Sequence, residues 1–140
     1  MAATVPNLWP VEQISLHVQT PLSILRAQAE HLGQLTKDAL RAEVETQRGD
    51  DGWVRHQLIL SAPALSFRQR VLLAAHKEEM VYPARLEADC FLPDSPTDTV
   101  ERQPLAATEK EFLDAVSEVF RSRQVRALVQ SLLARCNERR

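Results

Sequence analysis

The chain has 140 residues, of which 44% are hydrophobic and 26% are charged, and its formal net charge is -2. A chain of this size and composition forms one globular domain, 1–140, with its own hydrophobic core. These figures exclude a small scaffold that depends on disulfides, and they indicate no particular activity.

The cysteines and the start of the chain bear on the cellular compartment. Cys90 and Cys136 belong to no CxxC or Cys/His cluster, so neither a disulfide framework nor a zinc site is indicated. The first residues lack the basic and unbroken apolar regions of a secretory signal, and no stretch approaches the roughly 18 apolar residues of a membrane span. We therefore expect a cytoplasmic protein that does not act on a membrane.

An N-terminal arm over residues 1–19 precedes the first predicted helix. The arm contains a stretch, 14–18, that fits either a brief strand or an extended lead-in. A helix is expected to begin at Thr20 and Pro21, because threonine is a good N-cap and proline fits the first helical position. Apolar residues then recur at three- and four-residue steps as far as about 36–38. The predicted apolar stripe consists of Leu22, Leu25, Ala29, Leu32 and Leu35 or Thr36.

After this helix the apolar period falls to two, which indicates β-strands. The first strand, 40–45, leads into a turn at 48–52 that is rich in glycine and aspartate, and the second strand opens at Trp53. Third and fourth strands are expected at 67–76 and 80–88. Since sequential strands with short turns normally pair as neighbours, we predict an antiparallel meander of about four strands.

The alternation also predicts which side chains share a face of the sheet. With a reversal near Ala64, His76 is expected beside Trp53, and His56 beside Leu73. Pro83 indicates that the fourth strand is an edge strand or contains a bulge. In the second strand, the oilier face holds Val54, His56, Leu58, Leu60 and Ala62. In the third strand, Phe67, Val71, Leu73 and Ala75 are predicted opposite Arg68, Arg70, Leu72 and His76.

The C-terminal part is predicted to be helical over 108–138. It follows a long proline-containing connection, 89–107, and opens with a Thr-x-x-Glu capping box. Its apolar stripe loses phase near Ser122, which indicates either a kink or a separate helix capped by Ser122; we favour a break. The predicted class is α+β, with an antiparallel sheet of about four strands and with the N-terminal helix and C-terminal helices packed on one face.

Charge is unevenly distributed along the chain. Residues 77–118 hold 4 basic and 11 acidic side chains, whereas residues 121–140 hold 6 arginines and 1 glutamate. An arginine-rich end could bind a phosphate backbone. Helix dipoles favour a similar distribution, and the whole chain is not basic, so we do not expect nucleic acid to be the partner.

The sequence contains no recognisable catalytic or metal-binding spacing. Its four histidines form no HxxxH or HExxH motif, and no serine lies in a GxSxG motif. Three glycines cannot build a phosphate-binding loop. We therefore expect no metal, no cofactor and no catalytic residue.

The apolar stripe of the C-terminal helices points to association. Such a stripe covers the sheet of its own chain or contacts another subunit, commonly in a two-fold homodimer. We predict a non-catalytic protein–protein interaction or self-associating module, whose partner is a second copy or a different protein. The expected contact residues are Val125, Arg126, Leu128, Val129 and Leu132.

The alternative prediction is a small-ligand-binding or enzymatic domain. An α+β domain can hold a pocket between its sheet and its helices. The residues expected to line that pocket are Trp53, His56, Arg70 and Tyr82.

Overall fold

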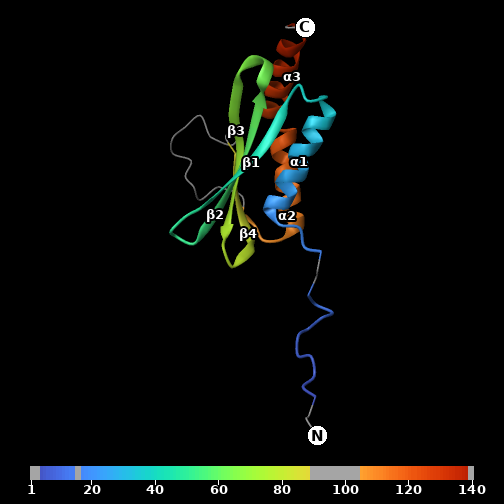
Figure 1. Ribbon diagram of the computed structural model, residues 1–140, viewed down its shortest axis with the longest axis vertical. Helices are drawn as coiled ribbons and strands as arrows, with labels where there is room; N and C mark the ends of the chain where they lie inside the picture. The colour runs from blue at the N-terminus through green and yellow to red at the C-terminus, as the bar shows by residue number, and fades with distance from the viewer. Residues whose placement is uncertain (1–3, 15–16, 89–104, 139–140) are drawn as a thin grey trace.

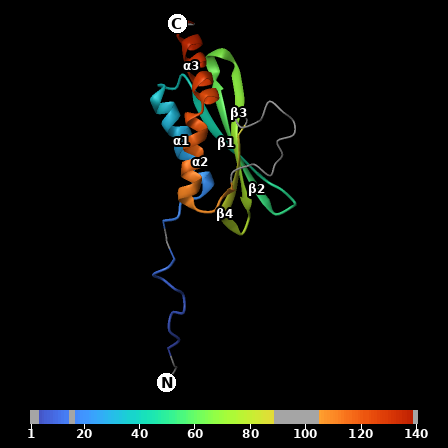
Figure 2. The ribbon, with the colours of Figure 1, turned by 180° about the vertical axis from the view of Figure 1, so that it is seen from behind.

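A computed structural model describes residues 4–14, 17–88 and 105–138. Within these residues an antiparallel sheet of five strands, in the order β1-β2-β3-β4-β5, carries three α-helices on one face (Figures 1 and 2). The predicted α+β class is confirmed. The elements are α1 Pro21–Leu35, β1 Arg41–Arg48, β2 Trp53–Ala62, the short 3-10 helix η1 Pro63–Leu65, β3 Phe67–Lys77, β4 Met80–Ala88, β5 Leu105–Ala106, α2 Glu109–Arg121 and α3 Arg123–Glu138.

The first helix begins where the sequence predicts. The side chain of Thr20 accepts a hydrogen bond from the amide of Ser23 at 3.1 Å, and Pro21 occupies the first helical position. The buried residues differ from the predicted stripe, because Ile24 is in the core and Leu35 is 80% exposed. Only the N-terminal half of α1 is therefore fully buried against the sheet.

A bulge in β3 corrects the predicted faces of that strand. Leu58 of β2 pairs with Leu72, whereas the next residue, Ile59, pairs with Arg70, so Val71 is an extra residue in β3. Two residues then oppose one, and the alternation changes phase. Leu72 and His76, predicted to lie opposite Val71, are buried together with it.

The predicted register of the β2–β3 hairpin holds between the turn and the bulge, where Ala62 pairs with Phe67, and is wrong by one residue beyond the bulge. Trp53 pairs with Lys77, and His56 pairs with Ala74. A shift of one residue moves side chains to the other face of the sheet. His76 therefore lies on the same face as His56, diagonally across the two strands, rather than beside Trp53.

The fourth strand is not an edge strand. Ala84 and Arg85 pair with β5, a strand that the sequence analysis placed within the 89–107 connection. The expected irregularity is present, since the β3–β4 register shifts between the pairs Ala75–Arg85 and Lys77–Met80. The cis Tyr82-Pro83 bond lies in this part of β4. Residues 89–104 of the predicted connection, with Cys90, lie outside the described residues.

The favoured break in the C-terminal helices is confirmed at Ser122. Its backbone is extended (ψ 151°), and its hydroxyl donates to the carbonyl of Val119 at 2.6 Å and accepts from the amide of Val125 at 3.3 Å. This serine therefore ends α2 and caps α3. At the start of α2, Thr108 accepts from the amide of Glu111, whose carboxylate accepts from the amide of Ala107 at 2.7 Å.

The hydrophobic core lies between the sheet and the three helices. Phe112, Val116 and Val119 give α2 a continuous buried face, whereas the buried residues of α3 are Leu132 and Cys136, in its C-terminal half. None of the helices described here combines the length and the apolar character that crossing a bilayer requires.

Candidate functional site

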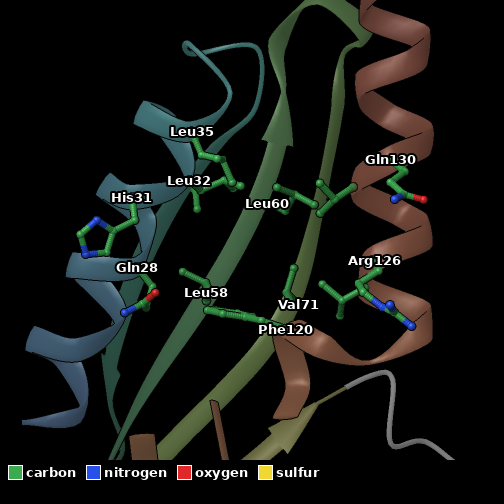
Figure 3. Close-up of a pocket in the computed structure, with 13 residues that line it drawn as sticks. Gln28, His31, Leu32, Leu35, Leu58, Leu60, Val71, Phe120, Arg126 and Gln130 are labelled. Atoms are coloured by element: carbon green, nitrogen blue, oxygen red, sulfur yellow. The ribbon is translucent and has the colours of Figure 1, made fainter. Parts of the chain in front are cut away.

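A groove of about 380 Å³ opens between α1 and α3, with the sheet as its floor (Figure 3). This volume is within the range of small-ligand and side-chain pockets. The lining residues are Ala42, Leu58, Leu60 and Val71 from the sheet, Gln28, His31, Leu32 and Leu35 from α1, Phe120 from α2, and Val125, Arg126, Val129 and Gln130 from α3.

The groove exists because α1 is anchored in the core by its N-terminal half and α3 by its C-terminal half. The fully buried side chains of α1 end at Leu25, whereas those of α3 begin at Leu132. Between these anchors the groove is lined by Gln28, His31, Leu32 and Leu35 of α1 and by Val125, Arg126, Val129 and Gln130 of α3. The apolar stripe of each helix is thus longer than the part that its own chain covers.

The floor and walls of the groove are apolar. Leu58 and Leu60 of β2 form a buried floor, while Val125 and Val129 are half-buried on the α3 side. On the α1 side Leu35 is 80% exposed, which is unusual for a leucine that adjoins so much other apolar surface. Such a surface favours the docking of further apolar side chains.

Polar side chains stand around the groove, among them one cation. Gln28 and His31 lie on the α1 side, and Arg126 and Gln130 on the α3 side (Figure 3). The guanidinium of Arg126 forms no ion pair with the described residues. Arg126 also lies near the N-terminus of α3, where the helix dipole disfavours a cation. A carboxylate at this side of the groove would therefore be favoured.

The structure brings together three of the five residues that the sequence predicts to contact a partner. Val125, Arg126 and Val129 line the groove. Leu128 is half-buried and packs against the core, and Leu132 is only 2% exposed and belongs to the core. The sequence analysis missed the opposing wall on α1. Its signal was the far end of the apolar stripe, but the pattern does not show which part of a stripe stays uncovered.

The four residues predicted for a ligand pocket do not meet in one site, and none of them lines the groove. Trp53 is on the sheet face opposite His56, with the guanidinium carbon of Arg85 5.6 Å from its ring centroid. Arg70 lies 3.8 Å from a carboxylate oxygen of Glu87.

Tyr82 instead joins the N-terminal arm to the body of the protein, which consists of the sheet and the three helices. Its hydroxyl donates to the carbonyl of Gln19 at 2.7 Å, and its ring meets that of Phe112 edge to face. The carboxylate of Glu109 accepts from the amide of Gln19 at 2.9 Å. Burial, with a smaller effect of Glu109, raises the pKa of Tyr82 to about 12, so the hydroxyl remains a hydrogen-bond donor at neutral pH.

His56 forms a buried hydrogen-bonded pair with His76, on the same sheet face as the groove floor. Their Nε2 atoms are 2.8 Å apart, His56 Nδ1 is 2.8 Å from the hydroxyl of Thr46, and His76 Nδ1 is 2.8 Å from the carbonyl oxygen of Lys77. Because that carbonyl only accepts, His76 Nδ1 carries a hydrogen. In the neutral pair His56 Nε2 then donates to His76 Nε2, and Thr46 donates to His56 Nδ1.

This arrangement satisfies both rings without a ligand. Burial, then the proximity of His76 and of Arg26, lowers the pKa of His56 to about 4. His56 is therefore neutral at physiological pH. The described residues contain no group of three His, Cys, Asp or Glu side chains that could hold a metal ion. The sequence analysis missed the pair because its register placed the two histidines on opposite faces.

Comparisons with protein-family models, with curated proteins and with solved structures found no match. Function is therefore inferred from the groove and its surroundings.

Proposed function

We propose that this chain is a non-catalytic interaction module that binds an apolar protein segment in the groove between α1, α3 and the sheet. The observation that carries the proposal is the open apolar surface around Leu35, Val125 and Val129. The partner is a protein, either a second copy or a different chain. We place this activity in the cytoplasm, where a free thiol such as that of Cys136 stays reduced.

The groove favours a segment with several closely spaced apolar side chains. Burying one valine, leucine or phenylalanine side chain contributes on the order of 1.5–3 kcal/mol. Association costs about 4–15 kcal/mol, so a single anchor does not suffice and three or more are needed. A helical or extended segment can supply them from one face.

Selection from a phage-displayed library of random peptides tests this function. We expect the wild-type protein to enrich peptides with clustered apolar residues, and Leu35→Glu to lose this enrichment because a charge then stands on the groove wall. Since Leu35 is 80% exposed, its replacement leaves the core intact.

Leu113→Glu is the matched control. Leu113 is 41% exposed on α2 and lies outside the groove. The same peptides should be enriched by this variant as by the wild type. Enrichment that persists in Leu35→Glu, or that fails in all three proteins, contradicts binding in the groove.

A second candidate is a small ligand with an apolar chain and an anionic head. The groove volume and the neighbouring Arg126 favour it. Palmitate is the probe, titrated by calorimetry. Under this alternative palmitate binds, and both Leu35→Glu and Arg126→Gln weaken its binding; a protein-segment site leaves the wild type without palmitate affinity.

A further inference from the structure

Residues 4–14 are the described outer part of the 1–19 segment and are called the arm from here on. The arm exposes an unusual amount of apolar surface. Its side chains are exposed by 78% at Val5, 82% at Leu8, 74% at Trp9 and 64% at Val11. Single exposed apolar residues are ordinary, but a cluster of four in a short segment marks an interaction surface. The arm and the groove are thus two uncovered apolar surfaces of one chain.

The arm has local structure of its own. The amide of Trp9 donates to the side-chain oxygen of Asn7 at 3.0 Å, and the amides of Gln13 and Ile14 donate to the carbonyl of Pro10 at 2.8 and 3.1 Å. These bonds form an Asx turn followed by a single helical turn. The apolar side chains are therefore displayed on a partly ordered backbone, which lowers the entropic cost of docking.

Charge also matches the arm to the groove. Glu12 is the only acidic residue among residues 1–19, and Arg126 is the only lysine or arginine among the described residues that line the groove. Arg126 stands at the end of α3 where a neighbouring carboxylate is most favourable. An arm with its apolar side chains in the groove can place Glu12 at this cation.

The direction in which the arm leaves the body favours contact with the groove of a second copy of the chain over contact with its own groove. Gln19 is held by Tyr82 and Glu109 at the N-terminal ends of α1 and α2. From there the arm runs away from the body, whereas the groove adjoins the C-terminal half of α1 (Figures 1, 2 and 3). To enter its own groove the chain would have to reverse next to Gln19.

We propose that the arm, residues 4–14, of one copy occupies the groove of a second copy, and that two copies exchange arms about a two-fold axis. This inference rests on the proposed function, because it uses the same groove, and it adds the identity of the occupant. A two-fold pair satisfies both uncovered surfaces in each chain and closes without further copies.

Solution mass by analytical ultracentrifugation, over rising protein concentration, is the first test. The wild type and the Leu113→Glu control should dimerise. A chain lacking residues 1–14 and the Leu35→Glu chain should each remain monomeric. Circular dichroism of every variant checks that the body is folded.

Mixing the two monomeric variants gives the sharper result. The Leu35→Glu chain still has its arm and the truncated chain still has its groove, so together they can make one arm–groove contact. We expect a heterodimer that is weaker than the wild-type homodimer. In a Trp53→Phe background, Trp9 emission should shift to shorter wavelength as this heterodimer forms.

Charge reversal tests the match between Glu12 and Arg126. Glu12→Arg and Arg126→Glu should each weaken dimerisation about two- to thirtyfold, because each variant removes an exposed ion pair from both arm–groove contacts of the dimer. The double variant should recover wild-type dimerisation.

Three outcomes would overturn arm exchange. The first is a dimer that persists when residues 1–14 are removed. The second is a mixture of the Leu35→Glu chain and the truncated chain that stays monomeric. The third is a wild-type monomer in which Trp9 is buried at every concentration, which would mean that the arm docks in the groove of its own chain. If selection still yields apolar peptides that depend on Leu35 while the wild type stays monomeric with Trp9 exposed, arm exchange fails and the proposed function stands. If Leu35→Glu changes neither peptide enrichment nor dimerisation, both fail.

Discussion

The His56–His76 pair is a buried contact between two titratable side chains. The two rings, the Thr46 hydroxyl and the Lys77 carbonyl form a continuous series of hydrogen bonds on the core face of the sheet. Both histidines are buried, so water cannot readily replace a lost partner. The neutral form of His56 is therefore part of the folded state.

The free energy of unfolding should fall as the solution is acidified. An unfolded histidine has a pKa of 6.5 and folded His56 has one of about 4. Between these values the unfolded state binds more protons, so stability is lost as pH falls from about 6.5 towards 4, by an amount on the order of 1–3 kcal/mol. Urea unfolding at a series of pH values measures this loss.

His56→Gln should reduce that pH dependence, because glutamine does not titrate and its amide can still donate to His76. The control is His31→Gln, whose side chain is exposed on α1. This control should keep the wild-type dependence. An equally steep loss in His56→Gln would show that other groups cause it.

At the scale of elements, the break at Ser122 decides how the two C-terminal helices are used. Before it, α2 buries Phe112, Val116 and Val119 in the core. After it, α3 is anchored only by its C-terminal half, which leaves Val125 and Val129 for the groove wall. A continuous helix would place these side chains out of phase with the stripe of α2.

Ser122→Ala should destabilise the protein by about 0.5–2 kcal/mol, the usual cost of removing an N-cap hydroxyl. The reason is that the amide of Val125 loses its acceptor. Thermal unfolding of the variant and the wild type compares the two proteins. Ser131→Ala, at an exposed position within α3, should change stability by less than about 0.5 kcal/mol. Equal effects at the two serines would contradict a capping role.

At the scale of the whole molecule, the body and the arm are distinct. The hydrogen bonds described for residues 4–14 join these residues to one another, and Gln19 is anchored to the body by Tyr82 and Glu109. At the other end of the body, the C-terminal end of α3 packs near the start of β1, and the Sγ atom of Cys136 lies 4.0 Å from the carbonyl oxygen of Ala39. No residue of 4–14 belongs to the hydrophobic core of the body.

Removal of residues 1–14 should therefore leave the unfolding free energy of the monomer unchanged to within about 0.5 kcal/mol. Urea unfolding at a concentration too low for association measures it. A larger loss of stability would mean that the arm supports its own body.

The local features of this protein can be predicted from its amino-acid sequence. N-caps, turn residues and the change of apolar period act within a few residues, and they are legible at Thr20, at Ser122 and in the strands. They were sufficient for the α+β class, for four of the five strands and for the break between α2 and α3. They also indicated the α3 wall of the groove at Val125 and Val129.

The other features depend on partners that are distant in the chain, so the sequence pattern does not show them. The extra residue at Val71 shifts the β2–β3 register by one residue, and this shift brings His56 and His76 together. The short strand β5 exists through its pairing with β4. The groove arises because α1 and α3 cover the sheet with opposite halves, a property of how two helices lie on a sheet and not of either apolar stripe.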